Sequence, residues 1–268
     1  MSASWLTGGC VWSRVMERHL SASLMHAAHE EAATRAMHRC ARTWRTAAEL
    51  LGPASGATAV WWHLVRPCAE ALGWAPGDDV PVIVGGIPMR EASASLGALR
   101  QTILSMPWGM GHEGLQRAAT RVGAERGTPW VAVCNGLTWR WYDATRPFTR
   151  VHIGVDLTHA AIDARVWQAL WLMAQPGAAD RTTRSGGGSL IERLIASSTH
   201  ERTGSTKALR DGVLDTLAQL DRHAAGDRDA HVTLVFQWLF LLFAESRALA
   251  PLWHPADRRS YSIATLAR

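Results

Sequence analysis

Lysine is almost missing from this sequence, because Lys207 is the only one among 268 residues. Arginine therefore carries nearly all of the positive charge behind a formal net charge of +5. Its planar guanidinium suits phosphate groups and guanine, and a basic balance favours acidic partners such as nucleic acid. A GC-rich genome would produce the same arginine bias, so composition alone leaves both explanations open.

Closely spaced cysteines are missing as well. The cysteines are Cys10, Cys40, Cys68 and Cys134. Without a CxxC motif the sequence suggests neither a zinc ribbon nor a disulfide framework, which favours a reducing cytoplasm. The first residues lack a basic segment followed by an unbroken apolar run, so we expect no secretory signal.

No apolar run is long enough to span a membrane. The longest, residues 232–244, is interrupted by Gln237 and followed by Glu245, whereas a membrane-spanning helix needs roughly 20 residues. We therefore expect a buried helix here, no membrane contact and a cytoplasmic protein.

The composition is typical of a globular chain, with 47% hydrophobic and 19% charged residues. We predict an α/β (α+β) domain over residues 1–175, in which helices occupy residues 11–73 and a sheet occupies residues 80–157. A Gly/Ser/Pro-rich stretch predicts a linker over residues 176–189. The pattern beyond it predicts a helical domain over residues 190–268.

Apolar periodicity predicts the individual helices. We expect a long helix broken once over residues 11–51, one over 58–72 that Pro67 kinks, one over 112–124 and one over 160–173. After the linker we expect helices over residues 190–197, 206–223 and 230–250. Residues 89–111 fit neither period clearly.

Strands are predicted for RVHIGVDL, residues 150–157, and for two earlier segments. VPVIVGG, residues 80–86, is a short β-branched run bounded by glycines and is typical of a buried strand. Further along, Asn135 and Gly136 suit the two central positions of a type I′ turn and are flanked by apolar runs, which predicts a β-hairpin. Alternation after the turn places Trp139 and Trp141 on one face, where we expect them to lie in the core.

Four phrases, in this order along the chain, resemble segments of one family. They are GPASGATAVWWHLVRPCAEALGW (residues 52–74), WVAVCNGLTWRWYDATRPFTRVHIGVDL (130–157), ALRDGVLDTLAQL (208–220) and VFQWLFLLFAESRALAP (235–251). Together they resemble the N-terminal nuclease-like region and the helical connector of large type IIG restriction-modification enzymes. The resemblance runs from Trp44 to the C-terminus.

The resemblance implies a PD-(D/E)XK nuclease-like fold, double-stranded DNA as a partner, and an adenine-specific methyltransferase downstream. The S-adenosylmethionine loop and the Asn-Pro-Pro-Tyr/Phe motif of that methyltransferase do not occur here. The resemblance therefore implies an incomplete member of the family. It is either a subunit that works with a separate methyltransferase chain or a fragment of a longer enzyme.

In the family's nuclease, an acid on one strand and an acid-x-lysine on the next hold Mg²⁺. Residues 82–86 offer neither acid nor lysine where the resemblance places that pair. The weak candidates for a catalytic site are Asp79, Glu91 and Gln101, with Gln101 replacing the lysine. We expect a fold without a metal site, hence no cofactor, and Mg²⁺ only if the nuclease is active.

Arginines cluster around the predicted hairpin. Arg117, Arg121 and Arg126 precede it, and Arg140, Arg146 and Arg150 lie on it or just after it. Such a group would suit contacts to DNA phosphates. A scattered, solvated set of charges explains the pattern equally well.

The last apolar helix predicts an interface. Its large side chains surround the helix, so a single neighbouring face cannot bury them all. We expect Trp238, Leu242, Glu245 and Arg247 to contribute to an interface with a methyltransferase chain or with a second copy of this chain.

Three functions remain open from the sequence. The first is a non-catalytic or degenerate-nuclease component of a bacterial restriction-modification or phage-defence system, which binds DNA or docks the methyltransferase. The second is an active Mg²⁺-dependent endonuclease subunit. The third is a pure interaction module or a truncated fragment, and we expect no enzymatic activity from the chain on its own.

Overall fold

A computed structural model describes residues 5–9, 11, 13–24, 27–146, 152–178, 189–224 and 226–246. The chain divides into two compact units, Met1–His200 and Glu201–Arg268. The division falls after His200, whereas the predicted linker was residues 176–189, of which residues 179–188 lie outside the described part.

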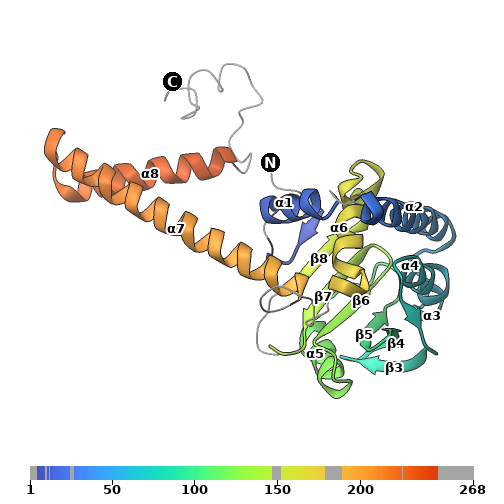
Figure 1. The fold of residues 1–268 in the computed structure, drawn as a ribbon. Helices are drawn as coiled ribbons and strands as arrows, with labels where there is room; N and C mark the ends of the chain where they lie inside the picture. Colours follow the sequence, from blue (N-terminus) through green and yellow to red (C-terminus); the bar gives the residue numbers. More distant parts are fainter. Residues whose placement is uncertain are drawn as a thin grey trace. The chain divides into compact units, whose positions relative to one another are not determined.

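After the short strand β1 (Leu6–Thr7), helices begin the first unit, as the sequence predicts (Figure 1). α1 covers Ser13–Leu24 and α2 covers Ala27–Leu50, where the sequence predicts one long helix broken once; residues 25–26 lie outside the described part of the chain. α2 has no proline and places Ala33, Cys40 and Ala47 in the core at helical spacing.

The segment around Pro67 contains both α-helical and π-helical turns. α3 covers Ala57–Val60, a π-helical turn η1 covers Trp61–Val65, and α4 covers Arg66–Ala71. Proline has no N–H for the regular hydrogen bond to the carbonyl four residues earlier, and a π-turn is one way to accommodate the loss. The predicted kink at Pro67 is therefore a local change of helix type.

One mixed sheet forms the centre of the first unit. Its strands are β1 (Leu6–Thr7), β2 (Ala75–Pro76), β3 (Val80–Val84), β4 (Ile87–Leu96), β5 (Leu99–Ser105), β6 (Trp130–Cys134), β7 (Thr138–Asp143) and β8 (His152–Asp156). The order is β1-β8-β7-β6-β5-β4-β2, and β3 also pairs with β4. Among the described pairs β5 and β6 are parallel and the others antiparallel. The predicted mixed α/β class is confirmed.

Helix α5, Leu115–Glu125, connects the parallel pair β5 and β6. It covers one face of the sheet, where Leu115 packs with Leu104, Val131 and Tyr142. The other face packs against the N-terminal helices and α6, Arg165–Ala174, which follows the 3-10 turn η2, Leu157–Ala161. We call these the α5 face and the helix face. Both Trp139 and Trp141 are buried on the helix face, as predicted.

The predicted strand in residues 80–86 is present, but the prediction that it is buried is wrong. Among the described strands β3 pairs with β4 alone. Ile83 is 79% exposed, and Val84 is the one buried residue of the strand. Pro81 has no N–H to donate to a second neighbour, which suits an edge strand. The apolar run thus lies at the border of the sheet.

The predicted hairpin is present, but its turn is shifted by one residue. β6 and β7 are antiparallel with Cys134 opposite Trp139, and the Asn135 N–H donates to the Thr138 carbonyl at 3.3 Å. Gly136 and Leu137 are therefore the central residues, with Gly136 at φ 88°. A glycine at the first central position is typical of a type II′ turn. The Asn135 side chain accepts from the N–H of Leu137 and of Thr138, so this residue closes the turn instead of occupying its centre.

Two helices dominate the remainder of the described chain. α7, Leu190–His223, is one continuous helix where the sequence predicts two, and its first turns bury Ile191 and Leu194 in the first unit's core. A 3-10 turn, Pro176–Ala178, precedes it in the chain. α8, Arg228–Ser246, follows a short turn. Within the described ranges no helix combines the length and apolarity that crossing a membrane requires.

Candidate functional site

The acids proposed for a nuclease site are each held by an arginine. Glu91, on β4, accepts hydrogen bonds from Arg126 Nε at 2.5 Å and from a terminal guanidinium nitrogen at 3.2 Å. Asp79, just before β3, accepts from Arg90 Nε at 2.5 Å. Arg90 and Glu91 are consecutive on β4 and therefore point to opposite faces of the sheet.

Gln101 lies away from Glu91. Glu91 is opposite Leu104 in the pairing of β4 with β5, so these two share a face. Gln101 is three residues before Leu104 and points to the other face, where it lines a small internal cavity with Trp139 and Trp141. The structure does not bring Asp79, Glu91 and Gln101 together.

These residues do not fit a Mg²⁺ ion. Magnesium requires octahedral oxygen ligands, usually carboxylates, around one point. Here the two acids are neutralised by guanidinium groups, and the amide lies across the sheet. No group of three histidine, cysteine, aspartate or glutamate side chains that could hold a metal occurs in the described ranges.

Five of the six predicted DNA-contacting arginines are described, and they differ in exposure and in ion pairing. Arg117 and Arg121 are exposed, one turn apart on α5, and no ion pair found among the described residues involves them. Arg126 is bound to Glu91, and Arg146 lies 3.7 Å from Asp143. Arg140 is half-buried on the α5 face of β7. Arg150 lies outside the described residues.

A chain of hydrogen bonds fixes the loop before α5 to the hairpin. Asn135 Nδ2 donates to the Met110 carbonyl at 2.8 Å, which leaves Oδ1 as the acceptor for the Thr138 hydroxyl at 3.1 Å. His112 Nε2 is 2.8 Å from that hydroxyl oxygen and must donate to it, because the hydroxyl proton is already used. Nδ1 of the neutral ring then accepts from the Tyr142 hydroxyl at 3.2 Å.

Burial keeps this network neutral. Burial, with smaller effects of Arg140 and His152, lowers the pKa of His112 to about 3. Burial also raises the pKa of Tyr142, which the positive charge of Arg140 opposes. A protonated His112 would have two donors and no acceptor for Tyr142, so neutrality preserves the chain of bonds. The network holds the entry of α5, and with it Arg117 and Arg121, in place.

Arg140 lies over a glycine of the neighbouring strand. Gly154 is opposite both Arg140 on β7 and Thr7 on β1. A Cβ at Gly154 would stand 2.2 Å from Thr7 Oγ1 and 3.3 Å from Arg140 Cγ, so the glycine provides the space for the arginine stem. Burial and then Arg140 lower the pKa of the adjacent His152 to about 4.

Sequence reasoning missed His112, Tyr142 and His152. The motif around His112 invites comparison with metalloprotease motifs, but Gln116 replaces the second histidine. The available signal was alternation in β7, which places Thr138, Arg140 and Tyr142 on the face opposite the tryptophans.

Three of the four predicted interface residues, Trp238, Leu242 and Glu245, lie on α8. Trp238 is 45% and Leu242 44% exposed. Glu245 is half-buried, and Arg247 lies outside the described part of the chain.

No protein-family model, curated protein or solved structure matches this chain.

Proposed function

We propose that this chain is a non-catalytic, DNA-binding component of a bacterial restriction-modification or phage-defence system that works with an adenine-specific methyltransferase chain. The resemblance to type IIG enzymes supports this proposal. So does a mixed sheet with N-terminal helices, which is consistent with a nuclease-like fold of the PD-(D/E)XK type.

The proposal rests on a difference between the arginines that are paired with acids and the arginines that are exposed. Arg90 and Arg126 neutralise the acids that a nuclease would use, whereas Arg117 and Arg121 are exposed on α5. Arginines without an acid partner are free to contact phosphates, which dominate the affinity of proteins for DNA. This contrast favours DNA binding over cleavage.

Fluorescence anisotropy with a labelled DNA duplex tests this function. We expect R117Q/R121Q to weaken binding and to lower the slope of log K against log salt by roughly 2, about 0.9 for each lost phosphate contact. The matched control is R42Q/R45Q, which removes the same charge from exposed positions of α2 on the helix face. Equal effects of the two double variants would contradict a specific role of α5.

Plasmid cleavage with Mg²⁺ separates this proposal from an active endonuclease. We expect no cleavage by the wild-type chain. Cleavage that E91Q abolishes would establish the endonuclease instead.

The apolar surface of α8 favours a second candidate, a pure interaction module that docks a methyltransferase chain without touching DNA. Such a module would show no salt-dependent DNA binding even at low salt. Binding that R117Q/R121Q weakens would exclude this candidate.

A further inference from the structure

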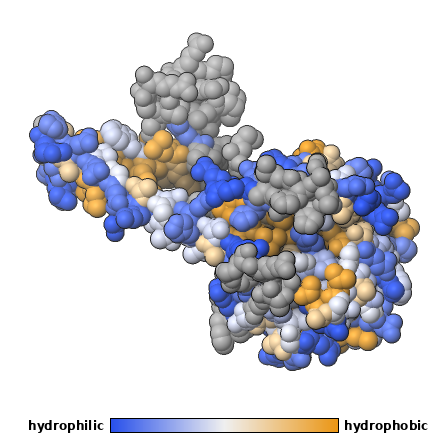
Figure 2. Space-filling model, in the orientation of Figure 1, coloured by the Kyte–Doolittle hydropathy of each residue, from blue (hydrophilic) through white to orange (hydrophobic). Residues whose placement is uncertain are grey.

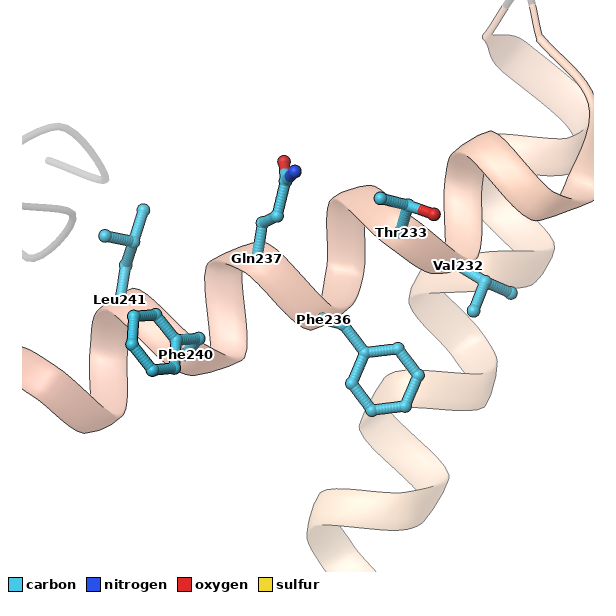
Figure 3. Close-up of a pocket in the computed structure, with 6 residues that line it drawn as sticks. All are labelled: Val232, Thr233, Phe236, Gln237, Phe240 and Leu241. Carbon is cyan, nitrogen blue, oxygen red and sulfur yellow. The ribbon is translucent and has the colours of Figure 1, made fainter.

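An open hollow on α8 has an apolar lining and no charged group. Hydrophobic residues of the second unit appear as orange surface in Figure 2. The hollow has a volume of about 540 Å³, and Figure 3 shows the side chains that line it. They are Val232, Thr233, Phe236, Gln237, Phe240 and Leu241, none of which is ionisable. The hollow therefore offers no charge with which to hold an ion.

The first unit has the opposite chemistry near the β1 edge of its sheet. Thr7 and Arg140 are both opposite Gly154, so their side chains lie side by side over this glycine on the α5 face. His152 is two residues before Gly154 on the same face of β8, and its ring centroid is 5.8 Å from that of Tyr142. Thr7, Arg140 and His152 are each half-buried. We call these three residues the β1-edge cluster.

Each member of the β1-edge cluster has an enclosed polar atom without a hydrogen bond. The atoms are Thr7 Oγ1, Arg140 Nε and His152 Nε2, and no residue in the described part of the chain is a partner for any of them. Buried polar groups without a partner are unfavourable, and in native proteins most are satisfied by the protein, by water or by a bound ion. Three such atoms in one patch therefore indicate a group that comes from outside the chain.

The charge of Arg140 has no counter-charge. A half-buried guanidinium ordinarily pairs with an acid, but no ion pair found among the described residues involves Arg140. Asp156 lies on the same face of β8, yet its carboxylate accepts from the Thr158 N–H at 2.9 Å and from the Thr158 hydroxyl at 2.6 Å. Glu113, whose charge reaches Tyr142, is exposed. The missing group is therefore expected to be an anion.

The donors of the cluster suit a phosphate group. A guanidinium only donates, a threonine hydroxyl can donate, and a neutral imidazole can donate from Nε2. Burial and then Arg140 lower the pKa of His152 to about 4, so this ring is neutral near neutral pH. The donors come from three strands, β1, β7 and β8. A phosphate monoester presents three free oxygens to them, whereas a carboxylate has two, and arginine is well suited to phosphate.

We propose that Thr7, Arg140 and His152 form a binding site for a phosphate group with three free oxygens, as in a phosphate monoester or inorganic phosphate. Arg140 supplies the charge, and the Thr7 hydroxyl and His152 Nε2 donate hydrogen bonds. The ligand enters from solvent, because all three side chains are partly exposed. The site does not rest on the proposed DNA binding by Arg117 and Arg121, and either can fail without the other.

Calorimetric titration of the full chain with sodium phosphate at constant ionic strength tests the site. We expect saturable binding of one phosphate per chain and an affinity roughly 10- to 100-fold weaker in R140Q, because a hydrogen-bonded charge is lost. The matched control R42Q removes the same charge from an exposed position of α2 and is expected to bind as the wild type does. A wild-type chain that binds no phosphate, or that binds acetate as tightly, would overturn the proposal.

The variant T7V tests the site without removing a charge. Valine has nearly the shape of threonine, so we expect unchanged circular dichroism and a phosphate affinity roughly tenfold weaker, because one hydrogen bond to the anion is lost. The control T46V, at an exposed position of α2, is expected to have the affinity of the wild type. Wild-type affinity in T7V would reject the three-donor site.

A DNA duplex with and without 5′-phosphate groups distinguishes the two sources of the ligand. Tighter binding of the phosphorylated duplex, reduced by T7V, would identify the ligand as a DNA end. Equal binding of both duplexes, with phosphate still bound in the titration, would identify it as a small phosphate compound. R117Q/R121Q retains all three residues of the cluster, so failure of the proposed DNA-binding function would leave the phosphate titration unchanged.

Discussion

Arg126 and Glu91 join the end of α5 to the middle of β4 through two hydrogen bonds between residues 35 positions apart. The Glu91 side chain is 8% exposed and the Arg126 side chain 55% exposed. The arginine therefore brings a solvent-facing charge to a nearly buried carboxylate.

Removing this arginine is expected to destabilise the first unit. In R126Q the nearly buried Glu91 carboxylate loses its charged hydrogen-bond partner, so we expect a lower free energy of unfolding. Urea unfolding followed by tryptophan fluorescence measures the loss. R121Q, on the same helix and without an ion pair among the described residues, is the control and is expected to leave stability unchanged. A similar loss in both variants would contradict the importance of the pair.

Replacing Gln101 is expected to have the opposite effect on stability from replacing Arg126. Gln101 is 3% exposed, and no residue in the described part of the chain is a hydrogen-bond partner for its Nε2. Because an unpaired buried amide is unfavourable, we expect Q101M to raise the melting temperature or leave it unchanged. A marked loss of stability, measured by calorimetry, would show that the Gln101 amide is satisfied in solution.

Acid should destabilise the protein through His112. The pKa of His112 is about 3 in the fold, and in the unfolded chain it is near the ordinary histidine value of 6.5. Between these pH values the unfolded chain therefore binds the extra proton. The stabilisation is complete above pH 6.5 and is lost as pH falls toward 3. At about 1.4 kcal/mol per pKa unit, the loss by pH 4 is on the order of 3 kcal/mol.

Urea unfolding at several pH values checks this dependence. We expect the free energy of unfolding to fall less steeply with acid in H112Q, because this variant has no imidazole to protonate. Identical slopes in the two proteins would show that His112 is not the group responsible.

Gly136 should tolerate no side chain. A Cβ there would lie 2.2 Å from Trp108 Cε3, and the backbone is at φ 88°. Because a non-glycine residue in the left-handed region costs roughly 1–3 kcal/mol before any clash, we expect G136A to lower stability by at least that amount. The control is G204A, in the exposed middle of α7 with open space around its Cα, where alanine favours the helix. A neutral G136A would contradict the packing of Trp108 on the turn.

Local chemistry made some of this fold predictable. The hairpin around Asn135 and Gly136 follows from turn preferences, and burial of Trp139 and Trp141 follows from alternation in β7. The one-residue shift of the turn was not predictable in this way. It depends on Met110, which accepts from the Asn135 side chain and so fixes the amide orientation.

Other features depend on partners that are distant in the sequence. VPVIV has the composition of a buried strand, but burial is decided by neighbouring strands, and β3 has only β4. Likewise, Glu91 and Gln101 point to opposite faces because Leu96 pairs with Leu99 across a two-residue turn. If the turn took in one residue more, so that Leu96 paired with the residue after Leu99, Gln101 would point to the same face as Glu91. The length of this turn, and not a local sequence pattern, therefore decides whether the two residues can share a site.

The pairing of β1 with β8 sets an order of events during synthesis. Leu6 is opposite Val155 and Thr7 is opposite Gly154, so the first strand to leave the ribosome has no partner until the last strand has been made. At a synthesis rate of roughly 5–20 residues per second, that wait is about 7–30 seconds. The edge of the sheet at β8, which contains His152 and Gly154, is therefore completed by β1, which the ribosome released long before β8.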